Sequence, residues 1–343
     1  MGIHHKISLN SFIVSKLIFV TLHICMRIGI IGTGTVGSAL IDMFIKNKVP
    51  ISIICSSKTY CKHPTINWRQ EMTIGNGMGL MKEMTDVMID CTANEEISKQ
   101  YIEWDKHVIA ANKKGLSGEL NYFKQLMQSS HKIYFESSCG AGLPLIRTLS
   151  DMVKSGDELQ RIEGVLSGTL SYIFNNFTTS FSDIVLQAKS LGYTEPDPRD
   201  DLNGIDVMRK LLILGRVCGL NLEASDIIVN NIVPEALRQV ELDDFLSKLP
   251  LYDDHFLQLA RKATMNQTCL RYVGTLNIID KSYTVDLNEY PKDHIFSQLK
   301  GSDNVVKLIS KRFPNGLIIQ GSGAGAEVTA FGCYSDYLRL VNE

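Results

Sequence analysis

The stretch RIGIIGTGTVGSALIDMF, Arg27–Phe44, joins a short β-branched run to a helical pattern through a glycine-rich turn. Gly32, Gly34 and Gly37 have GxGxxG spacing, after the predicted strand and at the start of the predicted helix. These glycines allow the backbone to approach a pyrophosphate, whose charge meets the N–H groups at the helix start. A glycine-rich turn without a ligand is the simpler alternative. The stretch favours a dinucleotide-binding domain.

Short β-branched runs and helical patterns alternate after this stretch, which is typical of a parallel sheet covered by helices. The predicted strands are Ile28–Ile31, Ile51–Cys55, Val87–Cys91, His107–Ala110 and Lys132–Phe135. The predicted helices are Val36–Lys46, Glu95–Trp104 and Glu119–Ser129. We therefore expect an α/β fold with a Rossmann-type, doubly wound parallel sheet.

Beyond Gly140 the pattern indicates a second, mixed α+β domain. Its predicted helices are Leu143–Lys154, Thr169–Phe177, Ser182–Ser190 and Gly204–Val217, and its predicted strands are Arg161–Leu166, Leu270–Leu276, Tyr283–Leu287, Val305–Lys311 and Leu317–Ile319. A last helix, Glu327–Leu340, follows the turn GSGAG and is expected to return to the first domain. The predicted domains are 26–140 with 321–343, and 141–320.

Residues 1–25 are set apart from this pattern. SKLIFVTLHIC, Ser15–Cys25, resembles a weak signal-peptide core but is too short and polar to span a bilayer. Met26 stands directly before the glycine-rich stretch. We expect residues 1–25 to be a dispensable extension, with a targeting peptide as the alternative.

The composition favours small-molecule partners. The 343 residues are 44% hydrophobic and carry a formal charge of −2, so nothing indicates a nucleic-acid or membrane surface. The eight cysteines show no CxxC motif and no zinc spacing, so we expect reduced thiols in a cytoplasmic protein.

Polar residues after the second, third and fourth strands predict the rest of a cofactor site. ICSSKTY has no acidic residue for a ribose 2′-hydroxyl, whereas Ser56, Ser57 and Lys58 are suited to a 2′-phosphate. This favours NADP(H), or use of both cofactors, over strict NAD(H). An exposed polar turn is the simpler alternative. Because ligands of open α/β sheets gather at the carboxyl ends of strands, further residues are expected beside the nicotinamide. They are Thr92, Asn94, Asn112 and Lys113, although Lys113 could equally be a solvated lysine beside Lys114.

A charged pair lies one helical turn apart in DDLNGIDVMRKLLILG, Asp200–Gly215. Helical geometry puts Asp206 and Lys210 on a stripe flanked by apolar residues, with Arg209 and Arg216 marking the solvent face. The pair is therefore expected to face packed protein or a cleft. A buried structural ion pair and a ligand-binding role both remain open at this point.

Five segments together resemble homoserine dehydrogenase. They are NKKG at 112–115, ESSCGAGLPLIRTL at 136–149, LSGTLSYIFNNF at 166–177, AKSLGYTEPDPRDDLNGIDVMRKLLIL at 188–214 and GSGAGAEVTAFG at 321–332. The chain is similar to the short, monofunctional branch, without an ACT regulatory domain. The resemblance implies reversible NAD(P)H-dependent reduction of L-aspartate 4-semialdehyde to L-homoserine in threonine and methionine biosynthesis. It also implies a homodimer formed by the second, substrate-binding domain.

The resemblance assigns roles to individual residues. Lys210 is the implied proton donor, Asp206 binds substrate beside it, and Lys113 is a cleft lysine shared by cofactor and substrate. Glu195 would hold the substrate's amino group, in a pocket lined by Tyr193, Asp201 and Thr169. The implied cofactor contacts are Thr33, Thr35, Val36, Gly192 and Gly325, in addition to the three glycines of the loop. Glu136 and the carbonyls of Cys139, Ala141 and Leu143 match a monovalent cation site, expected to hold sodium.

Two rival interpretations remain. Cys139 could be a catalytic thiol, as in aspartate-semialdehyde dehydrogenase, but such an enzyme also needs a histidine base and none lies in the matched segments. A small packing role for Cys139 is the alternative. The chain could also be a non-catalytic NADP-binding sensor, because a fold alone does not fix function.

Overall fold

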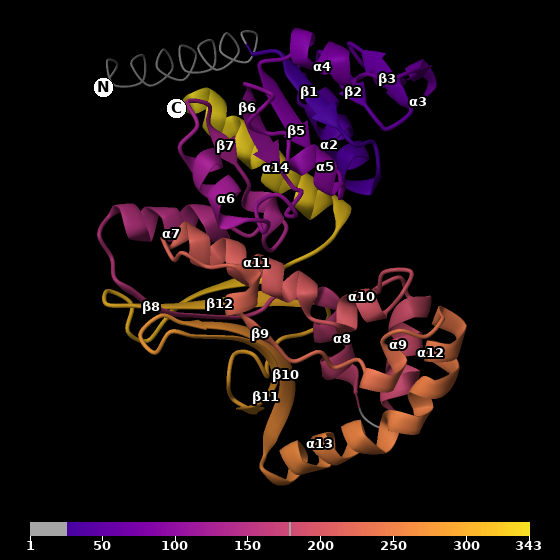
Figure 1. Cartoon of the computed structure of the whole chain (residues 1–343), viewed down its shortest axis with the longest axis vertical. Helices are drawn as coiled ribbons and strands as arrows, with labels where there is room; N and C mark the ends of the chain where they lie inside the picture. Colours follow the sequence, from indigo (N-terminus) through magenta and orange to yellow (C-terminus); the bar gives the residue numbers. More distant parts are fainter. Residues whose placement is uncertain (1–25, 178–179) are drawn as a thin grey trace, which may run out of the picture. The chain divides into compact units, whose positions relative to one another are not determined.

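The computed structural model describes residues 26–177 and 180–343, so the expectation for residues 1–25 lies outside the described part. The described chain divides into two compact units (Figure 1). Unit 1 comprises residues up to Gly115, Asn121–Ser138 and Gly325–Glu343, and unit 2 comprises Leu116–Leu120 and Cys139–Ala324. No sequence pattern predicts that the short segment Leu116–Leu120 joins unit 2.

Unit 1 is built on a seven-stranded sheet with the order β4-β3-β2-β1-β5-β6-β7. Five strands run parallel, and they are β2 (Ile53–Cys55), β1 (Ile28–Ile31), β5 (Val87–Asp90), β6 (His107–Ala110) and β7 (Ile133–Tyr134). β3 (Thr59–Lys62) and β4 (Thr73–Ile74) extend the β2 edge in antiparallel pairing, and neither was predicted. The predicted Rossmann-type sheet is confirmed, with an added antiparallel edge.

The helices of unit 1 pack around this sheet. They are α2 (Thr35–Lys46), α3 (Trp68–Glu71), α4 (Met78–Met84), α5 (Glu95–Ser98), α6 (Leu120–Met127), the 3₁₀ turn η1 (Glu136–Ser138) and α14 (Ala326–Asn342). The apolar side of α14 joins the core formed by β1 and α2, with Cys333 and Tyr337 fully buried beside Phe44. The predicted return of the last helix is therefore confirmed. The predicted helix Glu95–Trp104 was too long, because the chain turns after α5 and buries Tyr101 separately.

Unit 2 contains a six-stranded sheet with the order β13-β12-β8-β10-β11-β9. Its strands are β8 (Leu159–Val165), β9 (Ile228–Val229), β10 (Thr268–Asn277), β11 (Ser282–Pro291), β12 (Asp303–Ser310) and β13 (Leu317–Ser322). All neighbouring pairs are antiparallel except β9 with β11. One face packs against α11, because a Cβ at Gly274 on β10 would lie 3.3 Å from Val207 and 3.4 Å from Leu211. The opposite face forms a small core around Val273, Val305 and Phe296.

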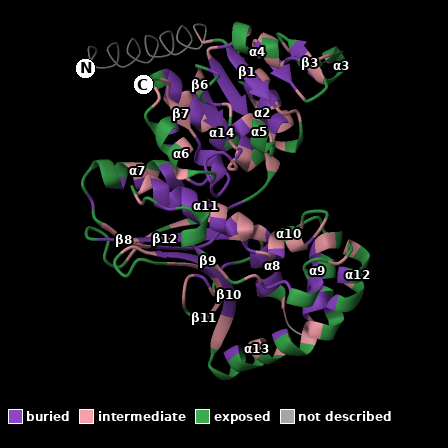
Figure 2. Ribbon diagram, in the orientation of Figure 1, coloured by how far each residue is buried: buried purple, intermediate pink, exposed green. Residues whose placement is uncertain are grey.

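The helices of unit 2 place the residues that the sequence singles out. They are α7 (Leu145–Lys154), α8 (Gly168–Asn176), α9 (Phe181–Ser190), α10 (Arg199–Leu202), α11 (Ile205–Val217), α12 (Leu242–Lys248) and α13 (Asp253–Met265), with 3₁₀ turns η2 (Ala224–Asp226), η3 (Glu235–Leu237) and η4 (Leu249–Tyr252). α10, α12 and α13 were not predicted. Figure 2 shows buried residues along α11 and mostly exposed residues along α13.

Across residues 26–177 and 180–343, no helix is both long and apolar enough to cross a membrane.

Candidate active site

The glycine-rich turn of unit 1 has the geometry of an anion-binding loop. Gly32 has φ +94°, and a Cβ at Gly37 would lie 1.8 Å from the carbonyl oxygen of Gly32, so helix α2 can approach the turn only with glycine there. A Cβ at Gly34 would meet nothing within 4 Å. Gly34 is the N-cap of α2 and no side chain caps this end, so the first N–H groups of α2 are suited to a phosphate. Thr33, Thr35 and Val36 lie in the same turn.

The loop after β2 is a hairpin into β3 rather than a helical crossover. The Ser56 hydroxyl accepts from the backbone N–H of Lys58 at 3.2 Å and of Thr59 at 3.0 Å. Ser56 therefore shapes the loop from within, whereas Lys58 is exposed. Of the two residues predicted to face a 2′-phosphate, Lys58 has the freer side chain to reach one.

A buried carboxylate connects the predicted polar residues at the ends of β5 and β6. Asp90 accepts from the Tyr101 hydroxyl at 2.7 Å, the Thr92 backbone N–H at 2.8 Å and the Asn112 amide at 3.0 Å. The Asn112 amide also donates to the Asn94 carbonyl at 2.8 Å. Burial raises the pKa of Asp90, and these hydrogen bonds oppose that shift. Sequence reasoning missed Asp90 as the centre of this network, although an acidic residue ending a buried apolar strand was the available signal.

These bonds fix the two strand-end segments that were predicted to border a nicotinamide. Asn94 also caps α5, accepting from the Glu96 backbone N–H at 2.9 Å. Lys113 follows Asn112 directly and is half-buried. Unit 1 therefore brings together the glycine-rich turn and the Thr92, Asn94 and Asn112 positions at the carboxyl ends of its parallel strands.

In unit 2, Lys210 and Asp206 form an ion pair within α11. The Lys210 Nζ atom lies 2.7 Å from Asp206 Oδ2 and donates to the Leu166 carbonyl at 2.8 Å. The Lys210 side chain is 11% exposed and that of Asp206 is 39% exposed. The pair thus lies at the edge of packed protein, as the helical geometry predicts. The Leu166 carbonyl is a backbone partner that no sequence pattern indicates.

Arg216, however, does not mark a solvent face, and that prediction was wrong. Its side chain is fully buried and donates to the carbonyls of Leu116 at 2.8 Å, Gly118 at 2.7 Å and Leu222 at 3.0 Å. It also pairs with Glu223 at 3.1 Å. A guanidinium has five N–H donors, so loop carbonyls can replace the water that it loses on burial.

A second cluster of predicted residues lies beside the start of α8. The Thr169 hydroxyl is 2.6 Å from the Tyr193 carbonyl and 2.8 Å from Asp201 Oδ1, and Asp201 Oδ2 accepts from the Glu195 backbone N–H at 2.8 Å. Burial, with smaller contributions from the charges of Glu195 and Asp206, raises the pKa of Asp201. The Tyr193 ring stacks on Tyr172, with the centroids 4.4 Å apart.

The carboxylates of Glu195, Asp201 and Asp206 are thus neighbours in unit 2, and Asp206 is paired with the Lys210 ammonium. The Asp201 carboxylate is held by hydrogen bonds, while Glu195 is exposed. Gly192, which precedes this segment, has φ +75° and ends the turn after α9. Such a surface can bind a small zwitterion, with a carboxylate for its ammonium group and a lysine for a developing negative charge.

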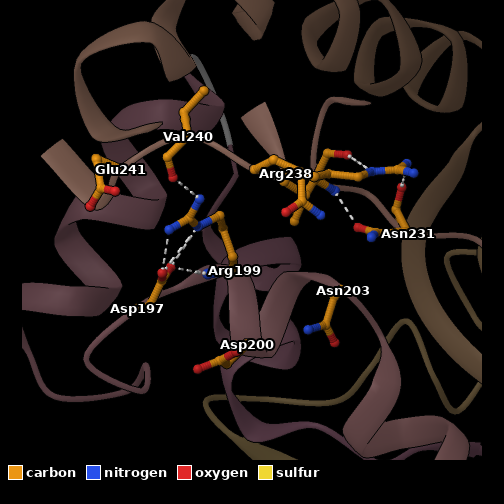
Figure 3. A pocket seen from close by; sticks show the side chains of 10 residues that line it. Asp197, Arg199, Asp200, Asn203, Asn231, Arg238, Val240 and Glu241 are labelled. Atoms are coloured by element: carbon orange, nitrogen blue, oxygen red, sulfur yellow. Dashed lines mark hydrogen bonds and ion pairs between the residues drawn. The ribbon is translucent and has the colours of Figure 1, made fainter. Parts of the chain in front are cut away.

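A polar pocket lies on another side of the same segment (Figure 3). It has a volume of about 480 Å³ and is lined by Asp197, Arg199, Asp200, Asn203, Asn231, Val233, Arg238, Gln239, Val240 and Glu241. Arg199 forms a bidentate pair with Asp197 and donates to the Val240 carbonyl at 2.6 Å. These two residues of EPDPRDD therefore anchor the segment, whereas Asp201 belongs to the carboxylate cluster.

The residues of the predicted cation site are divided between the two units. Glu136 is buried in η1 of unit 1, and its backbone N–H donates to Asp336 at 2.8 Å. Cys139, Ala141 and Leu143 belong to unit 2, where Ala141 has φ +55° in a tight turn. The Leu143 carbonyl accepts from the Leu145 backbone N–H at 2.8 Å. Within the described ranges, no group of three or more His, Cys, Asp or Glu side chains could hold a metal ion.

Cys139 has the environment of a packing residue. Its side chain is fully buried, and its thiol donates to the Lys210 carbonyl at 3.6 Å. All seven cysteines of the described ranges are free thiols.

Comparison with known proteins identifies the family. The model for homoserine dehydrogenase matches residues 144–338, and the model for the homoserine dehydrogenase NAD-binding domain matches residues 32–136. The chain is 36% identical to homoserine dehydrogenase of Saccharomyces cerevisiae, covering 92% of this chain and 98% of the yeast protein. It is 41% identical to bifunctional aspartokinase/homoserine dehydrogenase 2 of Zea mays, covering 92% of this chain. It spans only 38% of the length of that maize protein.

Solved structures agree with the fold. A protein of unknown function from Candida auris superposes with a TM-score of 0.87 at 35% identity, covering 93% of this chain and 98% of that one. A hyperthermophilic archaeal homoserine dehydrogenase in complex with NADPH superposes with a TM-score of 0.72 at 21% identity, covering 92% and 98%. At that identity the archaeal structure shows the shared fold alone. The two family models together match residues 32–136 and 144–338, and the yeast relative matches over 98% of its length. The chain therefore belongs to the homoserine dehydrogenase family of oxidoreductases.

Proposed function

We propose that this protein catalyses the reversible NAD(P)H-dependent reduction of L-aspartate 4-semialdehyde to L-homoserine. The observation that carries the proposal is the buried Lys210 ammonium, paired with Asp206 and lying on the α11 helix beside a cluster of carboxylates. A non-catalytic sensor would have no need to keep a buried ammonium there, because burying a charge is unfavourable unless its partners compensate.

Each charged group of unit 2 has a role in this reaction. Glu195 binds the substrate's ammonium group, and Asp201 fixes the Glu195 backbone through its 2.8 Å hydrogen bond. Thr169 and Tyr193 line the same pocket. Asp206 orients the Lys210 ammonium and also contacts the substrate's reacting end. The pocket thereby selects a small amino acid with a reactive group at the far end of its side chain.

The nicotinamide cofactor, when bound, supplies the hydride for the aldehyde carbon. Negative charge then develops on the aldehyde oxygen, and Lys210 stabilises this charge and donates a proton to the oxygen. In the reverse direction Lys210 accepts the proton from the hydroxyl. Lys113 provides a second cation at the cleft and contacts both cofactor and substrate.

Unit 1 would hold the cofactor, and the glycine-rich turn would bind its pyrophosphate. The uncapped N-terminus of α2 and the open space at Gly34 support this placement. We assign the nicotinamide to the Thr92, Asn94 and Asn112 positions, and Gly192 and Gly325 to close backbone contacts. Lys58 favours NADP(H) over NAD(H), since its exposed ammonium can pair with a 2′-phosphate.

A monovalent cation, sodium by preference, would be held by Glu136 and the carbonyls of Cys139, Ala141 and Leu143. The donor set is compatible with such an ion, because one buried carboxylate and carbonyl oxygens are hard oxygen ligands. The positive φ of Ala141 keeps successive carbonyls in a tight turn. The cation would be structural and would take no part in proton transfer.

The protein would act as a cytoplasmic homodimer in threonine and methionine biosynthesis. The mixed sheet of unit 2 offers the surface for pairing two copies. Light scattering of the purified protein tests the dimer, and a monomer at micromolar concentration would contradict it.

The test of the whole proposal is turnover. Purified protein should oxidise NADPH when L-aspartate 4-semialdehyde is added, with a lower kcat/KM for NADH. A protein that binds NADPH tightly but does not turn over the semialdehyde would favour the sensor alternative. Cys139→Ala should keep substantial activity, whereas complete loss with an intact fold would favour a catalytic thiol.

A further inference from the structure

Asn304 is a buried amide that lacks hydrogen-bond partners. It lies on β12, has 0% relative exposure, and neither its Nδ2 nor its Oδ1 atom has a partner. Among the residues that the structure describes, no other side chain has two such atoms. Buried polar groups are nearly always paired, and a leucine of similar shape would fill this space without desolvating an amide. A buried asparagine here therefore calls for a partner that the ligand-free chain does not provide.

The backbone of the glycine-rich loop Gly321–Gly325 lies directly over this amide. Gly321 on β13 is the register partner of Asn304. A Cβ added at Gly323 would lie 1.9 Å from Asn304 Cγ, 2.0 Å from Nδ2 and 2.5 Å from Oδ1. Gly323 is thus required by space, because any side chain would displace either the loop or the amide. The loop carries several peptide groups that could pair with Asn304 after a small shift.

Asn304 also lies on the side of the sheet that faces α11. Gly274 faces α11, and Gly274, Gly164 and Val306 are register partners across three strands. Asn304 is two residues before Val306, so its side chain is on the same face. The neighbouring Asp303 carbonyl accepts from Ser171 in α8 at 3.1 Å. The amide therefore lies under the loop, on the sheet face that packs against α11, and next to the residue that bonds α8.

We propose that Asn304 is a positioning residue for the Gly321–Gly325 loop, and that its amide pairs with the loop backbone when NADPH is bound. The proposal rests on the proposed cofactor, since Gly325 is the assigned cofactor contact at the end of this loop. In the structure the loop packs on the amide, and neither polar atom of the amide has a hydrogen-bond partner. Bound cofactor stabilises the loop position in which the amide is paired, and the paired amide in turn strengthens cofactor binding.

Three variants test whether Asn304 positions the loop through hydrogen bonds or only fills space beneath it. Asn304→Leu keeps the branched shape and the number of side-chain heavy atoms, and removes the polar atoms. Gly323→Ala introduces the clash, and the double variant Asn304→Ala with Gly323→Ala removes the three atoms nearest to the new Cβ. Ser310→Ala is the control, because Ser310 is equally buried on β12 but bonds Asp157 at 2.7 Å. The measurements are NADPH titration, thermal unfolding, and hydrogen exchange of the loop amides with and without NADPH.

We expect Asn304→Leu to unfold at the wild-type temperature or higher, because an unpaired amide contributes no stability. Its affinity for NADPH should fall roughly tenfold, about the effect of one lost hydrogen bond. NADPH should slow exchange of the loop amides in the wild type and in Ser310→Ala, but not in Asn304→Leu. The double variant should fold as the wild type does, yet keep the roughly tenfold loss of affinity.

Either of two results would overturn the proposal. A marked drop in the unfolding temperature of both Asn304→Leu and the double variant would show that the amide already stabilises the protein without NADPH. Wild-type NADPH affinity in Asn304→Leu or in the double variant would show that Asn304 only fills space. Neither measurement needs the semialdehyde. A wild type that binds NADPH with a protected loop but lacks turnover would overturn the proposed reaction and leave this inference standing, whereas a wild type that does not bind NADPH would overturn both.

Discussion

Replacement of Lys210 by methionine separates the stability of α11 from its chemistry. The Lys210 side chain is only 11% exposed, so methionine, an unbranched apolar side chain of similar length, fits the same space. Removing one partner of an ion pair is costly only when the other charge stays buried. Asp206 is 39% exposed and stays solvated after its partner is lost. The Leu166 carbonyl loses one donor, which costs about 1–3 kcal/mol.

The loss of stability should therefore be small, and the loss of rate should be large. A cost of about 1–3 kcal/mol corresponds to a fall in Tm of roughly 2–12 °C for a domain of this size. Loss of a general acid lowers kcat by about 10²–10⁴, which is roughly 3–5 kcal/mol in activation free energy. The assay follows NADPH oxidation at saturating semialdehyde, with thermal unfolding measured on the same preparation.

Lys210→Arg is the matched control. Arginine keeps the positive charge beside Asp206 but does not release its proton near neutral pH, so it should be nearly as inactive as Lys210→Met. Near-wild-type kcat in Lys210→Arg would show that charge alone matters. An effect of Lys210→Met on KM without an effect on kcat would refute the general-acid role and leave Lys210 as a binding residue.

Three further predictions concern the other charged groups. Glu195→Gln should raise KM for the semialdehyde roughly 10–100-fold with little change in kcat, which matches one hydrogen bond between charged groups; an effect on kcat alone would contradict this role. Lys58→Ala should lower kcat/KM with NADPH roughly fivefold and leave NADH unchanged, as for an exposed ion pair, and equal losses with both cofactors would count against it. Burial raises the pKa of Asp90 in the folded protein above its value of about 4 in the unfolded chain. The contribution of Asp90 to the free energy of unfolding therefore falls as the pH rises from the unfolded-state pKa through the folded-state pKa. Denaturant titrations at several pH values in that interval should show this fall in the wild type and not in Asp90→Asn. The same pH dependence in both proteins would contradict the prediction.

The periodicity of apolar residues predicts many of the helices and strands, because it shows which face of a single element is buried. The strands Ile28–Ile31 and His107–Ala110 were predicted with the observed bounds, since each is a short apolar run next to a glycine or polar turn. β3 and β4 were missed, because edge strands of four and two residues have too little alternation to stand out. α13 has a partly polar composition with few buried positions, so its pattern is weak.

The sequence predicts which side chains belong to the site, but it does not predict the backbone groups that they bond. The Lys210–Asp206 pair follows from helical spacing, but the Leu166 carbonyl that completes it does not. Arg216 was misassigned for the same reason, since two of its partners are the carbonyls of Leu116 and Gly118, which lie about a hundred residues away in the sequence. Asp90 is evident in the sequence as an acidic residue at the end of a strand. Its role depends on hydrogen bonds from Tyr101 and Asn112, which only the folded chain brings close to it.

The left-handed glycine before α11 limits how this enzyme can be redesigned. Gly204 has φ +77°, and a Cβ there would lie 2.1 Å from the Tyr272 hydroxyl, which itself donates to the Asn230 carbonyl at 2.6 Å. Any side chain at Gly204 would require a compensating change at Tyr272. A single substitution at Gly204 should therefore disturb the start of α11, and with it the angular setting of Asp206 and Lys210. Laboratory evolution toward other aldehydes should accumulate changes around Thr169, Tyr193 and Glu195, and leave the helix that carries the lysine untouched.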